Sequence, residues 1–152
     1  MKKFFNKMVV IFVMTVVMAF PSFAETSADS AALQNEAVAA FNSINEIRKQ
    51  NGLNEIRWMD ELGPATIKRA EEITVKQSHE RPDGSMWYTA DPDYLFGENF
   101  ASGYDTANDV INAWMSSPVH KENIMNPYYT GGNIQIVKVN DQWYWVNDFY
   151  ED

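Results

Sequence analysis

The sequence predicts helices packed on a small, mainly antiparallel sheet, which makes either an α+β domain or a layered α/β/α domain. Apolar side chains recur every three or four residues in three separate stretches, the pattern of amphipathic helices. Two β-rich runs, 134–139 and 142–146, are separated only by Asn140-Asp141, which is typical of a hairpin turn. With 152 residues, 45% of them apolar, the chain is long enough for one compact domain and too short for two.

The chain opens with a pattern typical of an export signal. Three lysines within the first seven residues precede the uncharged run 8–20 and a small-residue site, Ser22-Phe23-Ala24. This order predicts a signal peptide, residues 1–24, cut after Ala24. The run is too short to cross a hydrocarbon core of ~30 Å, and no later run is longer, so we expect no transmembrane segment in the mature chain. The protein is expected to be secreted, or periplasmic if its source has an outer membrane.

The predicted mature chain is strongly acidic and contains no cysteine. It keeps all 21 acidic residues and nine basic ones, a formal net charge of −12. This charge argues against nucleic-acid binding, which requires a basic surface. The missing cysteines exclude disulfides, thiolate metal ligands and a cysteine nucleophile. Stability therefore has to come from a packed core.

The domain proper is expected to span residues 32–152. Residues 25–31 are small and polar and predict a short tether. A first amphipathic helix follows from Leu33 and stops at Asn51-Gly52. The tether would therefore join the signal peptide to the first helix.

Two aspartates are expected to cap the next helices. Asp60 precedes the second helical pattern, and Asp105 precedes the third, which ends before Pro118. Between them, residues 78–104 are rich in Pro, Gly, Asp and Tyr without a sustained period. They predict a long ordered loop, and we expect the functional site to draw on it.

The familiar motifs of hydrolases and nucleotide enzymes are missing from the sequence. His79-Glu80 resembles the start of a helical zinc-protease motif, but position 83 holds Asp where the second histidine belongs. There is no Gly-x-Ser-x-Gly elbow, Ser-x-x-Lys pair or glycine-rich phosphate loop. What remains are the only two histidines, His79 and His120, with Glu98 between them along the chain.

Two interpretations of these three residues stay open from the residues alone. Together they would bind a divalent ion, with water in the remaining positions, or act as acid and base around a polar cleft. Alternatively, each histidine caps a turn or forms a local hydrogen bond. In the same loop, Arg81 and Asp83 are expected to form an ion pair.

Three separated motifs resemble the ordered signatures of bacterial CAP (SCP/PR-1-like) domains. They are S-H-E-R-P-D-G at 78–84, G-E-N-F-A-S-G at 97–103 and W-M-S-S-P-V-H-K-E-N-I-M-N-P at 114–127. The resemblance covers nearly all of residues 32–152. It implies a three-layer α/β/α sandwich with a small, mainly antiparallel sheet, in which His79, Glu98 and His120 converge in an open cleft. Glu98 then either ligates a metal directly or orients a histidine.

Further side chains are candidates for lining the same cleft. Many eukaryotic members of the family carry a second acidic residue about three positions after the helix tryptophan, where this chain has Met115-Ser116-Ser117. The second acid is missing, and Ser117 is a weak polar replacement. Asn99 is expected to be a structural turn residue that also borders the cleft. The loop aromatics Trp87, Tyr88 and Tyr94 either line a groove for a glycan or peptide or anchor the loop.

The resemblance implies binding rather than one general reaction. Some members of the family bind divalent metals through the two histidines, and others bind lipids or sterols. We therefore expect a divalent metal, zinc first among them, or a small ligand, peptide or cell-wall component in the cleft, and no turnover. One alternative is a metal-dependent hydrolase of peptide or cell-wall bonds with Glu98 as base. Another is a non-catalytic interaction module whose aromatic loop contacts an envelope protein.

Overall fold

The computed structural model describes residues 27–152, and the predicted signal peptide lies outside the described residues. The elements are, in chain order, α1 (Ser27–Gln50), β1 (Arg57–Trp58), η1 (Asp60–Leu62), α2 (Gly63–Val75), η2 (Trp87–Ala90), β2 (Gly97–Ser102), α3 (Ala107–Ser116), α4 (Pro118–Ile124), β3 (Tyr129–Val139) and β4 (Gln142–Glu151). Across residues 27–152, no helix has the length and apolar character needed to cross a membrane.

The four strands form one sheet in the order β1-β3-β4-β2. Both β3 and β2 pair with β4 in antiparallel fashion, whereas β1 pairs with β3 in parallel over only two residues. The two residues that join β3 to β4, Asn140 and Asp141, have positive φ angles of 50° and 64°. A two-residue turn of the type that matches strand twist requires this conformation, and Asn and Asp tolerate it. The predicted C-terminal hairpin is confirmed, with strands longer than the sequence predicts.

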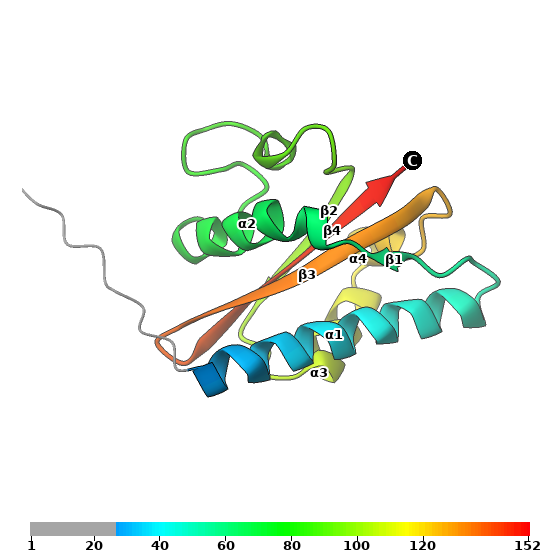
Figure 1. Ribbon diagram of the computed structural model, residues 1–152, viewed down its shortest axis with the longest axis horizontal. Coiled ribbons are helices and arrows are strands. Elements are labelled where there is room, and N and C mark those ends of the chain that lie inside the picture. Colours follow the sequence, from blue (N-terminus) through cyan, green and yellow to red (C-terminus); the bar gives the residue numbers. More distant parts are fainter. Residues whose placement is uncertain (1–26) are drawn as a thin grey trace, which may run out of the picture.

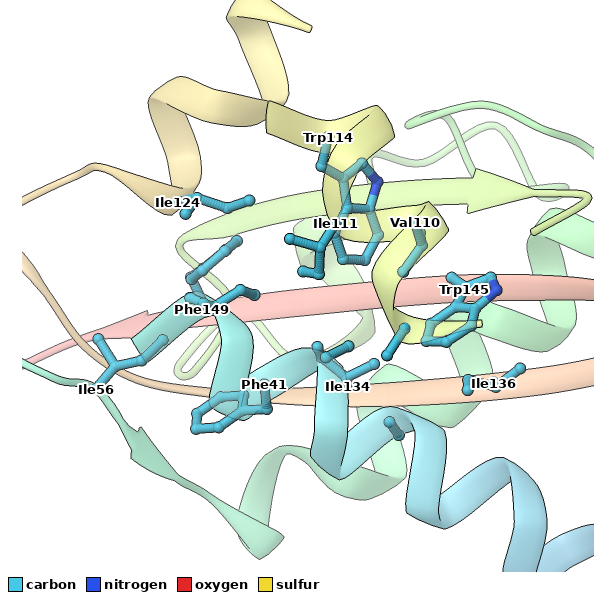
Figure 2. Packing of buried hydrophobic residues seen from close by; sticks show 14 of the residues in the cluster. Phe41, Ile56, Val110, Ile111, Trp114, Ile124, Ile134, Ile136, Trp145 and Phe149 are labelled. Carbon is cyan, nitrogen blue, oxygen red and sulfur yellow. The ribbon is translucent and has the colours of Figure 1, made fainter. Parts of the chain in front are cut away.

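Helices cover both faces of this sheet (Figure 1), with α2 on one side and α1, α3 and α4 on the other. On the α1 side, Trp145 and Phe149 of β4 pack in one cluster with Trp114 of α3 (Figure 2). On the opposite side, Tyr144 and Val146 of the same strand pack against α2. Alternate residues of β4 are therefore buried on both faces, which confirms the predicted α/β/α sandwich.

The first helix begins earlier than predicted. It starts at Ser27, so residues 27–31 are helical instead of forming a tether. Residues 29–32 are exposed, and Leu33 is the first buried side chain of the helix. The apolar pattern therefore located where packing begins, while the alanine-rich start extends the helix beyond the packed part.

Both predicted capping aspartates are wrong. Asp60 lies in η1, where its carboxylate accepts a hydrogen bond from Trp58 Nε1 at 2.8 Å, and α2 begins at Gly63 without a side-chain cap. The third helix is capped by Thr106, whose hydroxyl oxygen accepts from the Asp109 N–H at 3.2 Å. Thr106 has the extended backbone that a capping residue needs, so the cap lies one residue later than predicted.

A fully buried arginine, Arg48, ties the end of α1 to the end of α4 and the start of β3. Its guanidinium donates to the backbone carbonyls of Asn54, Ile124, Asn126 and Tyr129, at 2.8 to 3.2 Å. Burial lowers the pKa of Arg48. These bonds fix the end of α4, the helix that carries His120.

Candidate functional site at the β2 edge

Glu98 lies on the edge strand β2 and points toward α2. Its side chain is completely buried and forms a two-point ion pair with the equally buried Arg69 of α2. Arg69 Nε donates to Glu98 Oε2 at 2.6 Å and Nη2 donates to Oε1 at 3.2 Å. This parallel arrangement is the strongest form of carboxylate recognition by arginine, and it fixes the orientation of the carboxylate.

The ion pair continues into the loop that follows α2. Arg69 also donates to Glu72 at 2.6 Å and to the Ser78 carbonyl at 2.9 Å, and Glu72 accepts from Arg81 Nη2 at 2.8 Å. Burial acts to lower the pKa of Arg69, but Glu98 and Glu72 outweigh it and the pKa is raised. Burial likewise acts to raise the pKa of Glu72, and the two arginines lower it overall.

The predicted ion pair between Arg81 and Asp83 is replaced by another pairing. Arg81 binds Glu72 through both Nε and Nη2, and Asp83 instead accepts from the Ser85 N–H at 2.9 Å and from the Ser85 hydroxyl at 2.6 Å. Glu72 lies nine residues before Arg81, in the last turn of α2, and therefore next to the loop that follows this helix. The ion pair between Arg81 and Glu72 thus holds the loop against α2, close to His79.

His79 accordingly meets Glu98. Its Nδ1 lies 2.8 Å from Glu98 Oε1, and because an ionised carboxylate only accepts hydrogen bonds, Nδ1 carries the proton. The lone pair of the neutral ring is then on Nε2. The imidazole side chain is 44% exposed and packs edge-on against Phe100 of β2, with 4.9 Å between ring centroids. Glu98 therefore orients His79 so that Nε2 remains available.

The second histidine is held to the adjacent residue of the same strand. Asn99 Nδ2 donates to the backbone carbonyl of His120 at 3.0 Å, and Asn123 Nδ2 donates to Asn99 Oδ1 at 2.8 Å. Asn99 is fully buried and lies in β2, so it is a strand residue that fixes α4 and not the predicted turn residue. Burial lowers the pKa of His120, and the positive charge that His79 can carry lowers it further. Glu98 and Asn99 thus anchor the two histidine-bearing segments side by side.

Asp148 is a buried carboxyl that the sequence analysis missed. It pairs across the sheet with Glu98, is fully buried, and neither of its oxygens has a hydrogen-bond partner at bonding distance among residues 27–152. Burial raises the pKa of Asp148 well above its usual value, and the neighbouring Glu98 carboxylate raises it further, against smaller opposing effects of Thr66 and Arg69. Two carboxyl groups thus lie together with one arginine.

The remaining predicted residues lie around the fastened loop and the start of α4. Ser117 precedes Pro118 and is the first-turn residue whose carbonyl accepts from the Lys121 N–H. Trp87 packs against the Leu62 cluster and donates its backbone N–H to the His79 carbonyl at 2.8 Å. The Tyr88 ring lies edge-on to Trp87, and the Tyr94 ring packs against Tyr150. These contacts anchor the loop, which is one of the two roles left open for its aromatics.

The set of possible metal ligands around Glu98 is small. Within residues 27–152 no group of three or more His, Cys, Asp or Glu side chains is arranged to hold a metal ion. Both oxygens of Glu98 are already bonded to Arg69 and His79. The two imidazoles are the donors that remain among the predicted site residues, and two nitrogens are too few for a closed structural zinc site, which takes four protein ligands.

A layered sandwich with this Glu-Asn pair between two histidine segments defines a CAP-type domain. The model of the CAP family, the cysteine-rich secretory protein family, matches residues 41–149. This chain therefore belongs to the CAP family, although it contains no cysteine. It is 40% identical over 112 residues to the uncharacterized protein YkwD of Bacillus subtilis, covering 65% of this chain and 41% of YkwD. The chain thus spans about two fifths of the length of that relative.

Solved structures with the same fold come from proteins outside the cell or on its surface. An extracellular protein containing an SCP domain from Bacillus anthracis superposes with a TM-score of 0.72 at 20% identity, over 84% of this chain and 44% of that protein. An outer surface protein from Borrelia burgdorferi gives a TM-score of 0.66 at 23% identity, over 78% of this chain and 95% of that protein. At these identities the likeness establishes the fold alone.

Proposed function

We propose that this chain is an exported CAP-domain protein that acts by binding, with a small polar ligand or a divalent metal held between His79 and His120. The single observation that carries the proposal is the Arg69–Glu98–His79 chain of hydrogen bonds, which fixes one imidazole and leaves its Nε2 without a partner among residues 27–152. Such outer partners are what metal-binding histidines use to set their tautomer and orientation. The export pattern at the N-terminus and the extracellular or outer-surface character of the structural relatives support a role outside the cell.

The electrostatics of His120 favour a neutral, electron-donating ring. Burial and the nearby His79 lower the pKa of His120, so this ring stays unprotonated to lower pH than a free imidazole. Binding of a metal requires neutral imidazole, because a protonated ring has no lone pair to donate. We expect metal affinity to fall as the pH drops below about 6.5, the ordinary histidine pKa.

The hydrolase alternative receives less support from the geometry. A metal-assisted hydrolase would need Glu98 to take a proton from the attacking water. Glu98 is completely buried and both of its oxygens accept hydrogen bonds from neighbouring side chains. In this arrangement it acts as a positioning residue for His79, which is a role in binding.

Titration of the purified chain with zinc tests the metal form of the proposal. We expect wild type to bind zinc, and the double variant His79→Ala/His120→Ala to bind at least about 100-fold more weakly because both donors are gone. Glu80→Ala is the matched control, since Glu80 is an exposed acid beside His79 that pairs only with Lys76. Equal affinities of wild type and the double variant would remove the metal from the proposal, and unequal affinities that Glu80→Ala reproduces would assign zinc to the acidic surface.

A further inference from the structure

The edge of the sheet opposite the histidines is largely unpaired. In an antiparallel ladder, successive residues of a strand bond alternately to its two neighbours. The carbonyls of Trp143 and Phe149 in β4 accept hydrogen bonds from the β2 side. The alternate residues of β4, such as Tyr144 and Val146, therefore bond to β3. By this alternation, Ile136 and Lys138 of β3 direct their backbone N–H and C=O away from β4, toward the open edge.

The chain itself occupies only the beginning of this edge. Strand β1 pairs with Gly131 and Gly132, and the Met59 N–H donates to the Gly132 carbonyl at 2.9 Å. The chain then turns away into η1 and α2, and within residues 27–152 no further strand pairs with β3 on this side. An unpaired strand edge is a template for another strand.

Two hollows lie beside the open edge and share Gln34 of α1. One, of about 100 Å³, is lined by α1, by Ile67 of α2 and by Gln135 and Ile136 of β3. The other, of about 310 Å³, lies between α1 and the strand β1, and its lining residues are Gln34, Val38, Phe41, Asn42, Asn45, Ile56 and Trp58. The second hollow has the size of a small ligand site, and its lining combines apolar side chains with uncharged amides.

One of these amides already holds extended backbone. Asn45 Nδ2 donates to the Ile56 carbonyl at 2.9 Å, and Asn45 Oδ1 accepts from the Ile56 N–H at 2.8 Å. Asn42 and Gln34 lie further along the same side of α1, line the same hollow, and form no side-chain hydrogen bond within residues 27–152. Their side chains can form with an incoming chain the same pair of backbone hydrogen bonds that Asn45 forms with Ile56.

We propose that an extended peptide segment of another protein, apolar at alternate positions, binds as an added strand to the open β3 edge. Its backbone bonds to Ile136 and Lys138 and continues the pairing that β1 begins, and an apolar side chain enters the hollow beside Trp58. The edge lies between the α1 and α2 layers (Figure 1), so a second folded copy, whose own edge is flanked in the same way, is too broad to reach it. A single extended segment is narrow enough.

The experiment uses the hexapeptide acetyl-Thr-Val-Thr-Val-Thr-Val-amide with the ¹⁵N-labelled protein. We expect saturable binding and slower hydrogen exchange at the Ile136 and Lys138 amides, because both become hydrogen-bonded. The same peptide with every amide N-methylated should not bind. Gln34→Trp, an exposed position shared by the two hollows, should weaken binding by about tenfold or more. Asn35→Trp, the next exposed residue of α1, should leave it unchanged.

Three results would overturn this proposal. One is the absence of binding at millimolar peptide. A second is binding that shifts His79 and His120 without protecting the two β3 amides. The third is binding that Gln34→Trp and Asn35→Trp affect equally. A chito-oligosaccharide that perturbs Trp58 without protecting Ile136 would assign the larger hollow to a glycan instead. Because the β3 edge and the histidines lie at opposite edges of the sheet, this outcome is independent of the zinc titration.

Discussion

Replacing Arg69 with methionine is expected to lower the free energy of unfolding by about 3–5 kcal/mol, the usual cost of removing one member of a buried ion pair. Arg69 is the cation that balances Glu98, and both side chains are completely buried. Without it, the Glu98 carboxylate remains in the interior beside Asp148, with only the half-exposed His79 as a partner. Urea denaturation of wild type and Arg69→Met, compared at the same pH, measures the difference.

Arg57→Met is the matched control for this experiment. Arg57 also pairs with a carboxylate, Asp152 at 3.8 Å, but both side chains are more than half exposed. Exposed pairs contribute about 0–1 kcal/mol, so this variant should stay close to wild type. If Arg69→Met proved no more costly than Arg57→Met, the buried ion pair would not be the element that holds α2 to β2.

Replacing Asp148 with asparagine is expected to stabilise the protein by about 1–3 kcal/mol near neutral pH, because the wild-type carboxyl is charged in the unfolded state and its transfer into the interior costs more than that of an uncharged amide. The folded state raises the pKa of Asp148, through burial first and Glu98 second. A raised pKa means that the protonated form of Asp148 favours folding. Its contribution to the free energy of unfolding is therefore fully present below the unfolded-state pKa of about 3.9, and it is lost as the pH rises toward the folded-state pKa. An amide in this position carries no charge at any pH, so it does not share this pH dependence.

The gain should therefore depend on pH. We expect the difference between Asp148→Asn and wild type to be largest near pH 7 and to shrink toward about pH 3, which lies below the unfolded pKa of about 3.9, so that the wild-type carboxyl is protonated in both states. Asp141→Asn is the matched control, because Asp141 lies in the hairpin turn with its side chain 95% exposed. A difference that is the same at both pH values, or a loss of stability at pH 7, would contradict the raised pKa of Asp148.

The sequence predicted those parts of the fold that depend on local pattern. The hairpin follows from two β-rich runs around Asn140-Asp141, and the structure shows the positive φ angles that such a turn needs. The helical phase of Trp114 with Val110 and Ile111 indicates a core position, and Trp114 is 1% exposed. The family motifs, which span three separate segments, added the layered architecture. Helix caps were less predictable, because Thr106 and Asp105 are both capping residues and only the backbone decides between them.

The motifs did not predict the two charged neighbours of Glu98, because both lie outside the motif segments. Arg69 precedes Glu98 by 29 residues, and Asp148 follows it from the last strand. The sequence does contain one feature that marks each of these two residues as unusual. Arg69 shares the buried side of α2 with Thr66 and Ile73, and Asp148 follows Asn147 in a polar pair that interrupts the apolar and aromatic residues of β4. A charged residue on a buried face predicts a partner, but only the tertiary packing of α2 on the sheet identifies which one.

The most direct test of the proposed site is the tautomer of His79, read from the side-chain ¹⁵N resonances of its neutral ring. The hydrogen bond to Glu98 determines which ring nitrogen carries the proton. We predict a proton on Nδ1 and a free lone pair on Nε2. A ring protonated mainly on Nε2 would contradict it, because Glu98 would then not orient His79 and the unbonded nitrogen would not be available for a ligand.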